Sequence, residues 1–118
     1  MKFSVTIPEK ISLNKIYAGV HFRERMRHKE EYQWAVLEAK VPVWEGGFPV
    51  HIHYHFKLTG SRLDIDNHAY MEKMIADALV ANGVLPDDTQ EYIGAKTTTA
   101  EKLPKGESNR VEVTIVPV

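Results

Sequence analysis

The sequence predicts an α/β (α+β) fold, in which a single mixed β-sheet is covered by two helices in the order β-α-β-α-β-β. Alternating apolar side chains are the first observation, and they predict strands at residues 2–7, 50–58 and 110–116. Helical spacing of apolar side chains is the second, and it predicts an amphipathic helix that buries Met71, Ile75, Ala78 and Leu79. A length of 118 residues suffices to bury a core, so residues 1–118 are expected to form one domain.

The remaining elements follow from the positions of proline, glycine and apolar runs. Pro8 ends the first strand, and residues 9–20 are expected to form a loop. A helix is expected at residues 21–40, and residues 42–49, which include a Gly-Gly pair, connect it to the next strand. A further strand is expected at residues 90–99, and a proline and a glycine predict the turn before the last strand.

Three histidines share one face of the strand expected at residues 50–58. His51, His53 and His55 alternate with the apolar residues of the other face. Such a triplet invites a zinc site, but one flat strand face spaces the three side chains too widely to reach one ion, and no fourth ligand is evident. We therefore expect a face turned toward solvent or toward another subunit.

Composition limits the cellular compartments and the partners that we expect for the protein. The chain has no cysteine, which excludes disulfides and suits a reducing compartment. No apolar run reaches the length of a membrane span, and the N-terminal stretch lacks the apolar segment of a signal peptide. A cytoplasmic protein without membrane contact is expected. The formal net charge of −1 does not by itself indicate a nucleic-acid partner, so the distribution of charge matters more.

Two aspartates, Asp64 and Asp66, stand at the junction between a predicted strand and a predicted helix. If the strand stays extended through Asp66, both carboxylates point to one side, with their Cα atoms about 6.5–7 Å apart. At the start of the helix, Asp66 or Asn67 is expected as the N-cap. At its end, Gly83 occupies a position where helices commonly stop.

A second acidic pair, Asp87 and Asp88, follows the helix, and the intervening loop can bring it back beside Asp64 and Asp66. Converging carboxylates repel one another unless a cation lies between them. Mg²⁺ suits such a site, with Mn²⁺ as an alternative, because it prefers oxygen ligands and is often held by one or two carboxylates and a substrate phosphate. Phosphodiester hydrolysis is the corresponding chemistry. Taken singly, the same aspartates are also ordinary turn and cap residues.

The order of these residues resembles the RusA family of Holliday junction resolvases. In that family the motif reads D-x-D-N-x-x-K, then x-x-x-D-A-L, then a glycine and a later D-D. The chain matches this order with Asp64, Asp66, Asn67, Lys73, Asp77, Ala78, Leu79, Gly83, Asp87 and Asp88. The family's proline-then-S-x-N-x-x-Y opening also resembles the N-terminal residues Pro8, Ser12, Leu13, Asn14, Lys15 and Tyr17.

One departure from the family concerns the lysine. Five residues separate Asn67 from Lys73, where the family has two, so Tyr70 is the alternative when counting from Asp66. We favour Lys73, because three added residues nearly complete a helical turn and leave it within roughly 20° of Asp66 around the helix axis. Lys73 also keeps the family's spacing to Asp77.

The resemblance implies a Mg²⁺-dependent endonuclease that resolves four-way DNA junctions in recombination and repair, cutting symmetrically as a homodimer. It implies metal ligands at Asp64, Asp66 and Asp88, with Asp87 as the alternative third ligand, and a catalytic role for Lys73. Two other functions stay open. One is a module that grips branched DNA but cuts weakly or not at all, and the other is a metal-dependent phosphohydrolase acting on nucleotides.

Polar and basic residues supply candidate contacts to DNA phosphates. These candidates are Asn14, Lys15, Arg23, Arg25, Arg27 and Arg62, the last of which lies beside Asp64 in the chain. Glutamates accompany the arginines in the first part of the predicted helix, so a solvated helix face is an equally good interpretation of that segment.

Overall fold

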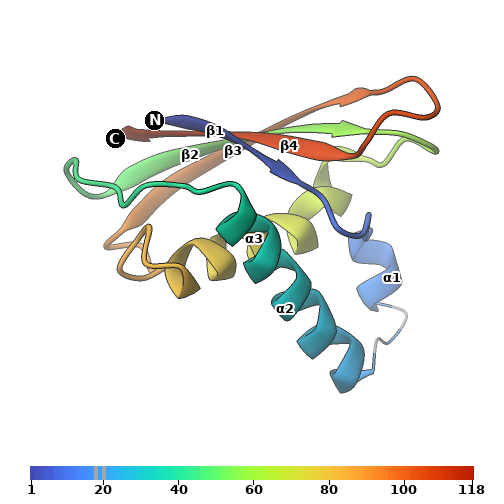
Figure 1. Cartoon of the computed structure of the whole chain (residues 1–118), viewed down its shortest axis with the longest axis horizontal. Coiled ribbons are helices and arrows are strands. Elements are labelled where there is room, and N and C mark those ends of the chain that lie inside the picture. Colours follow the sequence, from blue (N-terminus) through green and yellow to red (C-terminus); the bar gives the residue numbers. More distant parts are fainter. Residues whose placement is uncertain (18, 20) are drawn as a thin grey trace.

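Four strands form one mixed sheet in the order β1-β4-β2-β3 (Figure 1). They are β1 (Lys2–Thr6), β2 (Val50–Leu58), β3 (Ile93–Lys102) and β4 (Arg110–Pro117). β4 pairs antiparallel with β1 and with β2, whereas β2 and β3 run parallel. The computed structural model describes residues 1–17, 19 and 21–118, with Tyr17 described by its backbone alone. The predicted α/β (α+β) class with a single mixed sheet is confirmed.

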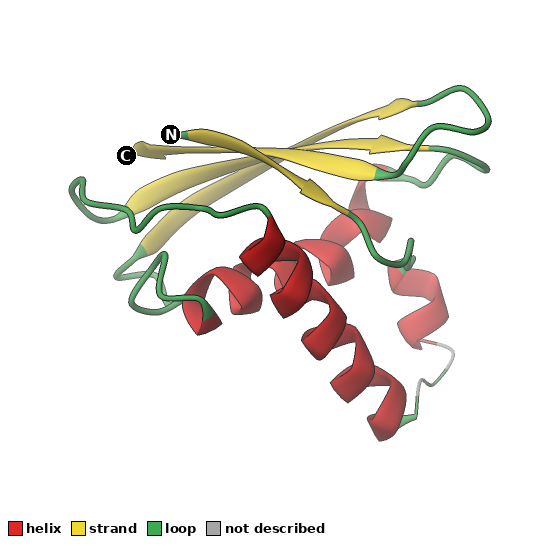
Figure 2. Ribbon diagram, viewed as in Figure 1, coloured by secondary structure: helices red, strands yellow, loops and turns green. Residues whose placement is uncertain are grey.

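Helices cover one face of this sheet and leave the other face bare (Figure 2). They are α1 (Leu13–Tyr17), α2 (Phe22–Glu38), the 3₁₀ helix η1 (Ile65–His68) and α3 (Ala69–Ala81). The two long helices, α2 and α3, are the predicted ones. A loop was expected where α1 forms, and that expectation is wrong. Ser12 Oγ accepts a hydrogen bond from the Lys15 N–H at 3.2 Å, as the side chain of an N-cap does.

The hydrophobic core lies between the sheet and the long helices. The inward side chains of β2 are buried, whereas the histidines between them are only partly so. The predicted apolar stripe of α3 is fully buried against this face. The period of two along the strand and the period of 3.6 along the helix have the same cause. In each element the apolar side chains recur on the one face that is buried away from water.

The start of α3 differs from the prediction, whereas its end agrees with it. The chain first makes the 3₁₀ turn η1, so His68 takes the N-cap position of α3 and no side chain caps the helix. The prediction that Asp66 or Asn67 caps it is wrong for this reason. The prediction for Gly83 is confirmed, because its φ of 75° lies in the left-handed region and its N–H donates to the Val80 carbonyl at 3.0 Å.

β3 begins later than predicted, at Ile93, and continues to Lys102. The N–H groups of Tyr92 and Ile93 both donate to the Thr89 carbonyl at 2.9 Å, so a turn occupies the first residues of the expected strand. Strand pairing starts only where Ile93 comes opposite Val50 on β2.

Glu72 of α3 is buried beneath β3, with 4% of its surface exposed. Lys96 Nζ donates to Glu72 Oε2 at 3.0 Å, and the Thr98 hydroxyl donates to Oε1. We expect Lys96→Met to lower the free energy of unfolding by about 1–3 kcal/mol, because a buried carboxylate loses one of its two partners. Urea denaturation measures this loss. Lys105→Met, in an exposed turn, is the control, and equal stability of the two variants would contradict the expectation.

No helix that the structure describes is both long and apolar enough to cross a membrane.

Candidate functional site

The segment between β2 and α3 carries Asp64 and Asp66. β2 ends at Leu58, and Asp64 directly precedes η1 with φ −60° and ψ 150°. The strand does not stay extended through Asp66, because Asp66 belongs to a 3₁₀ turn, so the condition under which the two carboxylates were expected to point to one side is not met. The Asp64 carbonyl accepts hydrogen bonds from the Asn67 N–H at 2.9 Å and from His68 Nδ1 at 3.1 Å. Both aspartates are exposed, so their carboxylates can meet a cation or a ligand.

Lys73 and Asp88 form a second group. Lys73 Nζ donates to Asp88 Oδ2 at 2.7 Å and lies 3.0 Å from Asp77 Oδ1. The hydrogen bond from Lys73 lowers the pKa of Asp88, and the hydrogen bonds to Asp88 and then Asp77 raise the pKa of Lys73. Asp87 Oδ1 accepts the Asp88 N–H at 2.8 Å, so Asp87 shapes the loop that carries Asp88. The structure thus brings together Lys73, Asp77 and Asp88.

The two groups lie at different levels along the helix axis. Lys73 comes seven residues after Asp66, which places it roughly 10 Å or more further along the chain axis. Asp66 belongs to the 3₁₀ turn that precedes α3, so the rotation expected for one continuous α-helix from Asp66 to Lys73 does not apply. Among the residues that the structure describes, no three or more His, Cys, Asp or Glu side chains are arranged to hold a metal ion. Mg²⁺ stays a prediction, with Asp64 and Asp66 as one candidate pair of ligands and Asp88 engaged by Lys73.

A pocket of about 470 Å³ opens at the carboxyl ends of the parallel strands β2 and β3. Arg62, which we predict to contact DNA, is exposed and lines this pocket together with Lys102. Lys10 Nζ donates to the carbonyl groups of Thr59, at 2.9 Å, and Ser61, and so holds the loop at the rim. Burial and then the charge of Lys102 lower the pKa of Lys10. This corner of the molecule is therefore rich in positive charge.

The other predicted DNA contacts are exposed on the first two helices. Asn14 and Lys15 lie on α1, and Arg23, Arg25 and Arg27 lie in the first turns of α2. The Tyr17 side chain, part of the N-terminal resemblance, lies outside the described residues.

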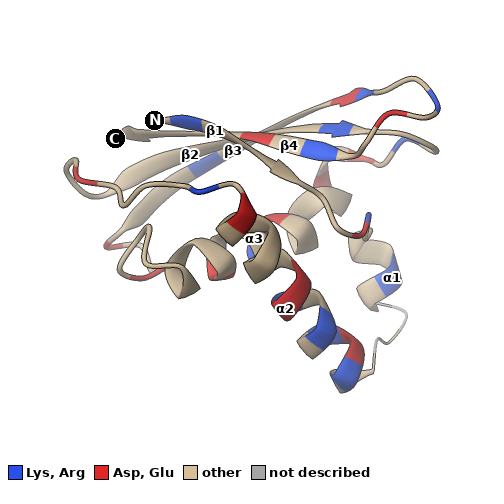
Figure 3. Cartoon of the chain, viewed as in Figure 1, with Lys and Arg blue, Asp and Glu red and all other residues tan. Residues whose placement is uncertain are grey.

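Arg27 differs from its neighbours, because it lies 2.9 Å from Glu31 and 3.4 Å from Glu9. The hydrogen bond to Glu31 raises the pKa of Arg27. Acidic and basic residues alternate along α2 (Figure 3). Arg27 thus belongs to a solvated helix face, whereas Arg23 and Arg25 remain candidates for DNA contact.

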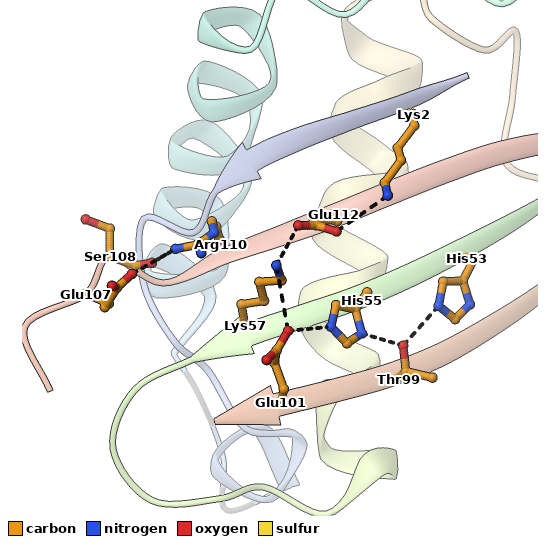
Figure 4. Close-up of polar contacts among 10 residues, drawn as sticks. All are labelled: Lys2, His53, His55, Lys57, Thr99, Glu101, Glu107, Ser108, Arg110 and Glu112. Atoms are coloured by element: carbon orange, nitrogen blue, oxygen red, sulfur yellow. Dashed lines mark hydrogen bonds and ion pairs between the residues drawn. The ribbon is translucent and has the colours of Figure 1, made fainter. Parts of the chain in front are cut away.

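The three histidines of β2 form a hydrogen-bonded chain with β3 on the bare face of the sheet, part of which Figure 4 shows. Glu101 accepts from His55 Nε2 at 3.0 Å, which in a neutral ring leaves Nδ1 to accept from the Thr99 hydroxyl at 2.6 Å. Thr99 in turn lies 2.9 Å from His53 Nε2, and Thr97 repeats the pattern between His53 and His51. All three histidines are partly exposed on this face, which agrees with the expectation of a face turned toward solvent or toward another subunit.

Sequence reasoning missed a buried polar group between α2 and α3. His28 is fully buried. Its Nε2 lies 2.8 Å from Glu9 Oε2, and its Nδ1 lies 2.9 Å from the Tyr70 hydroxyl. Glu9 accepts only, so Nε2 carries the hydrogen, and in a ring with a single hydrogen Nδ1 then accepts from the Tyr70 hydroxyl. Burial raises the pKa of Tyr70. Because the Tyr70 side chain is buried and its hydroxyl is paired with His28, Tyr70 has a role in packing. This favours Lys73 over Tyr70 at the lysine position of the motif.

A scan against models of protein families finds no match to this chain, and a search of curated proteins finds none either. The likeness to RusA resolvases rests on the motif residues alone.

The ion pair between Lys73 and Asp88 predicts a small pH dependence of stability. Because the folded pKa of Asp88 is lowered, the pair contributes fully above the unfolded pKa of about 3.9 and is lost as pH falls through the folded value. Lys73 is largely exposed, so the contribution is at most ~1 kcal/mol. The stability difference between wild type and Lys73→Met should be present at neutral pH and disappear in strong acid. Urea titrations at several pH values measure it, and a constant difference would contradict the assignment.

Proposed function

We propose that this chain is a Mg²⁺-dependent, structure-selective endonuclease that acts on four-way DNA junctions, similar to the RusA resolvases. The observation that carries the proposal is the pair of exposed aspartates, Asp64 and Asp66, in the turn leading into α3. The contacts of Lys73 with Asp77 and Asp88 further along the motif support it. Lys73 and Asp88, which are 15 residues apart in the sequence, meet in space there.

The carboxylates of Asp64 and Asp66 have the chemistry that Mg²⁺ prefers, and Mg²⁺ often needs only one or two carboxylates beside a substrate phosphate and waters. Both side chains are exposed, so an ion would reach them without disturbing the core. When bound, Mg²⁺ would neutralise phosphate charge and make a water more acidic. Asp88 is the third candidate, but it would have to exchange Lys73 for the ion, and Asp87 already accepts a backbone hydrogen bond.

Cationic side chains supply the rest of the proposed chemistry. Arg62 would orient the DNA by binding a phosphate with its fork of donors. Lys73 is charged at neutral pH, as lysines ordinarily are, and it would stabilise the negative charge that develops on the scissile phosphate. Symmetric cutting of two strands requires two such sites, so a homodimer is part of the proposal.

One observation favours a second function, a branched-DNA-binding module with weak or no cleavage. Asp88 is paired with Lys73, and the described residues hold no assembled set of three metal ligands. Gel-shift titration tests the partner that both functions share, since each requires tighter binding of a four-way junction than of linear duplex. Equal binding of the two DNAs would overturn both. A nucleotide phosphohydrolase would instead hydrolyse mononucleotides with no preference for junctions.

Millimolar Mg²⁺ is expected to raise the melting temperature of the wild-type protein, because a ligand that binds only the native form stabilises it by mass action. The rise should vanish in Asp66→Asn. Asp88→Asn distinguishes a metal ligand from a partner of Lys73. If the Mg²⁺-dependent rise in melting temperature is lost, Asp88 is a ligand, and if the rise is retained, Asp88 only pairs with Lys73. Scanning calorimetry at constant ionic strength measures the shift, and an equal rise in wild type and Asp66→Asn would refute metal binding at Asp66.

A further inference from the structure

The pocket at the carboxyl ends of β2 and β3 contains a group that the proposed chemistry does not use, the ring of His68. His68 is 1% exposed. Its Nδ1 lies 3.1 Å from the Asp64 carbonyl oxygen and 3.0 Å from that of Ile65. Carbonyl oxygens only accept hydrogen bonds, so Nδ1 carries the hydrogen, and in a ring with a single hydrogen Nε2 is then an acceptor.

This acceptor is not used within the described part of the chain, where no residue donates to Nε2. In the same residues, every fully buried side-chain nitrogen or oxygen has a partner, so Nε2 keeps a small opening to solvent. His68 lines the pocket, so we infer that this opening leads into the pocket. The ring of Phe56 lies against it, with centroids 4.8 Å apart, and helps to hold its orientation.

The rest of the pocket combines an apolar wall with positive charge. The apolar lining consists of Leu58, Leu63, Ile65 and Ala100. Arg62 and Lys102 supply cations, and the rim lysine Lys10 adds a third. Glu101 also lines the pocket, but it is engaged by His55 at 3.0 Å and by Lys57 at 3.7 Å. A fitting ligand therefore has an apolar body, an N–H donor and an anionic group.

We propose that the pocket receives one unstacked nucleotide of the branched DNA. The base lies among the apolar side chains and donates an N–H to His68 Nε2, while its phosphate lies beside Arg62 and Lys102. The volume of about 470 Å³ is in the range of small-ligand sites. An inorganic phosphate alone would leave the acceptor and the apolar wall unused. A metal ion would also leave the apolar wall unused, and it would be repelled by the cationic side chains of Arg62 and Lys102.

Branched DNA suits this occupant, because a base costs least to extrude where it is already unpaired or poorly stacked. Contact between the base and the protein then contributes binding energy that offsets the cost of extrusion, and this contribution does not depend on the identity of the base. The inference rests on the proposed function, since the nucleotide belongs to the same junction whose backbone Asp64 and Asp66 would engage. It adds a way to recognise the branch point itself.

The test uses a four-way junction with one 2-aminopurine beside the exchange point, bound in the presence of chelator so that nothing is cut. 2-Aminopurine brightens when it leaves the base stack. Ala100→Phe fills the pocket from an exposed position of β3, and Ala95→Phe is the matched control on the opposite face of that strand. His68→Asn keeps a donor toward the two carbonyl groups and removes the Nε2 acceptor.

We expect wild type and Ala95→Phe to raise the fluorescence several-fold, and Ala100→Phe and His68→Asn to lose most of that rise. Junction affinity in the two pocket variants should fall by about tenfold, the range of one base–protein contact. An unchanged rise in Ala100→Phe, with the junction still bound, would overturn the nucleotide pocket alone. Failure of wild type to bind the junction would overturn the proposed function and this inference together. Free deoxyadenosine monophosphate and unlabelled junction serve as competitors. If the mononucleotide displaces the labelled base and the junction does not, the occupant of the pocket is a mononucleotide and not DNA.

Discussion

Asp66→Asn is expected to lose junction cleavage by about two orders of magnitude or more while binding the junction as tightly as wild type. A bound metal contributes several kcal/mol of charge stabilisation in the transition state, and each 1.36 kcal/mol is a factor of ten in rate. Binding should persist or tighten, because one negative charge that repels DNA phosphate is removed. Asp66 is exposed and outside the core, so the fold should tolerate the change.

Asp64→Asn is expected to behave in the same way, since Asp64 directly precedes the 3₁₀ turn to which Asp66 belongs. Glu107→Gln is the control, because it removes one exposed carboxylate from the turn between β3 and β4. Single-turnover cleavage and gel shift with the same labelled junction provide the two readouts. Near-normal cutting by either aspartate variant would remove that residue from the metal site.

Lys73→Met should leave a folded protein that binds junctions but cuts them about a hundredfold more slowly, in line with the loss of one transition-state donor. The alternative is that Lys73 only pairs with Asp77 and Asp88 on the surface, at 3.0 Å and 2.7 Å. Surface ion pairs contribute less than ~1 kcal/mol to stability. That alternative predicts a small stability loss and normal turnover.

Lys29→Met is the matched control for Lys73→Met. Lys29 is another exposed lysine, and its Nζ lies 3.9 Å from the same Asp77. Tyr70→Phe tests the other reading of the motif, but it leaves buried His28 without its donor and should cost ~1–3 kcal/mol of stability. Unfolding must therefore be measured beside turnover. If Tyr70→Phe stops cutting in a folded protein and Lys73→Met does not, the motif must be counted from Asp66.

The parts of the fold that sequence reasoning predicted well are those in which periodicity reports burial. β2 was predicted with its observed bounds, and the four residues predicted for the apolar stripe of α3 are all buried. The helix buries further residues that the stripe did not include, namely Tyr70, Glu72, Met74 and Ala76. Elements held by local polar contacts were missed. α1 depends on one Ser12 cap, and η1 depends on hydrogen bonds to the Asp64 carbonyl. Neither produces an apolar period.

The arrangement of the candidate site could not be predicted from its residues alone. The helical-turn argument for Lys73 assumed an α-helix that starts near Asp66, whereas Asp66 lies in the 3₁₀ turn η1 and α3 starts at Ala69. Three added residues also add about 4.5 Å of rise along the axis. The pairing of Lys73 with Asp88 depends on the path of the loop after α3, which no local pattern encodes. The pocket around His68 depends on the parallel pairing of β2 with β3, since it brings Ala100 and Lys102 beside the segment from Arg62 to His68.

Cleavage of a synthetic four-way junction tests the central claim most directly. The same protein preparation is incubated with labelled junction or with linear duplex of the same sequence, in Mg²⁺ or in chelator. We predict paired, symmetric incisions in the junction with Mg²⁺, no incision with chelator, and little cutting of the duplex. Equal cutting of junction and duplex, or an intact junction in Mg²⁺ despite tight binding, would contradict a junction-resolving nuclease.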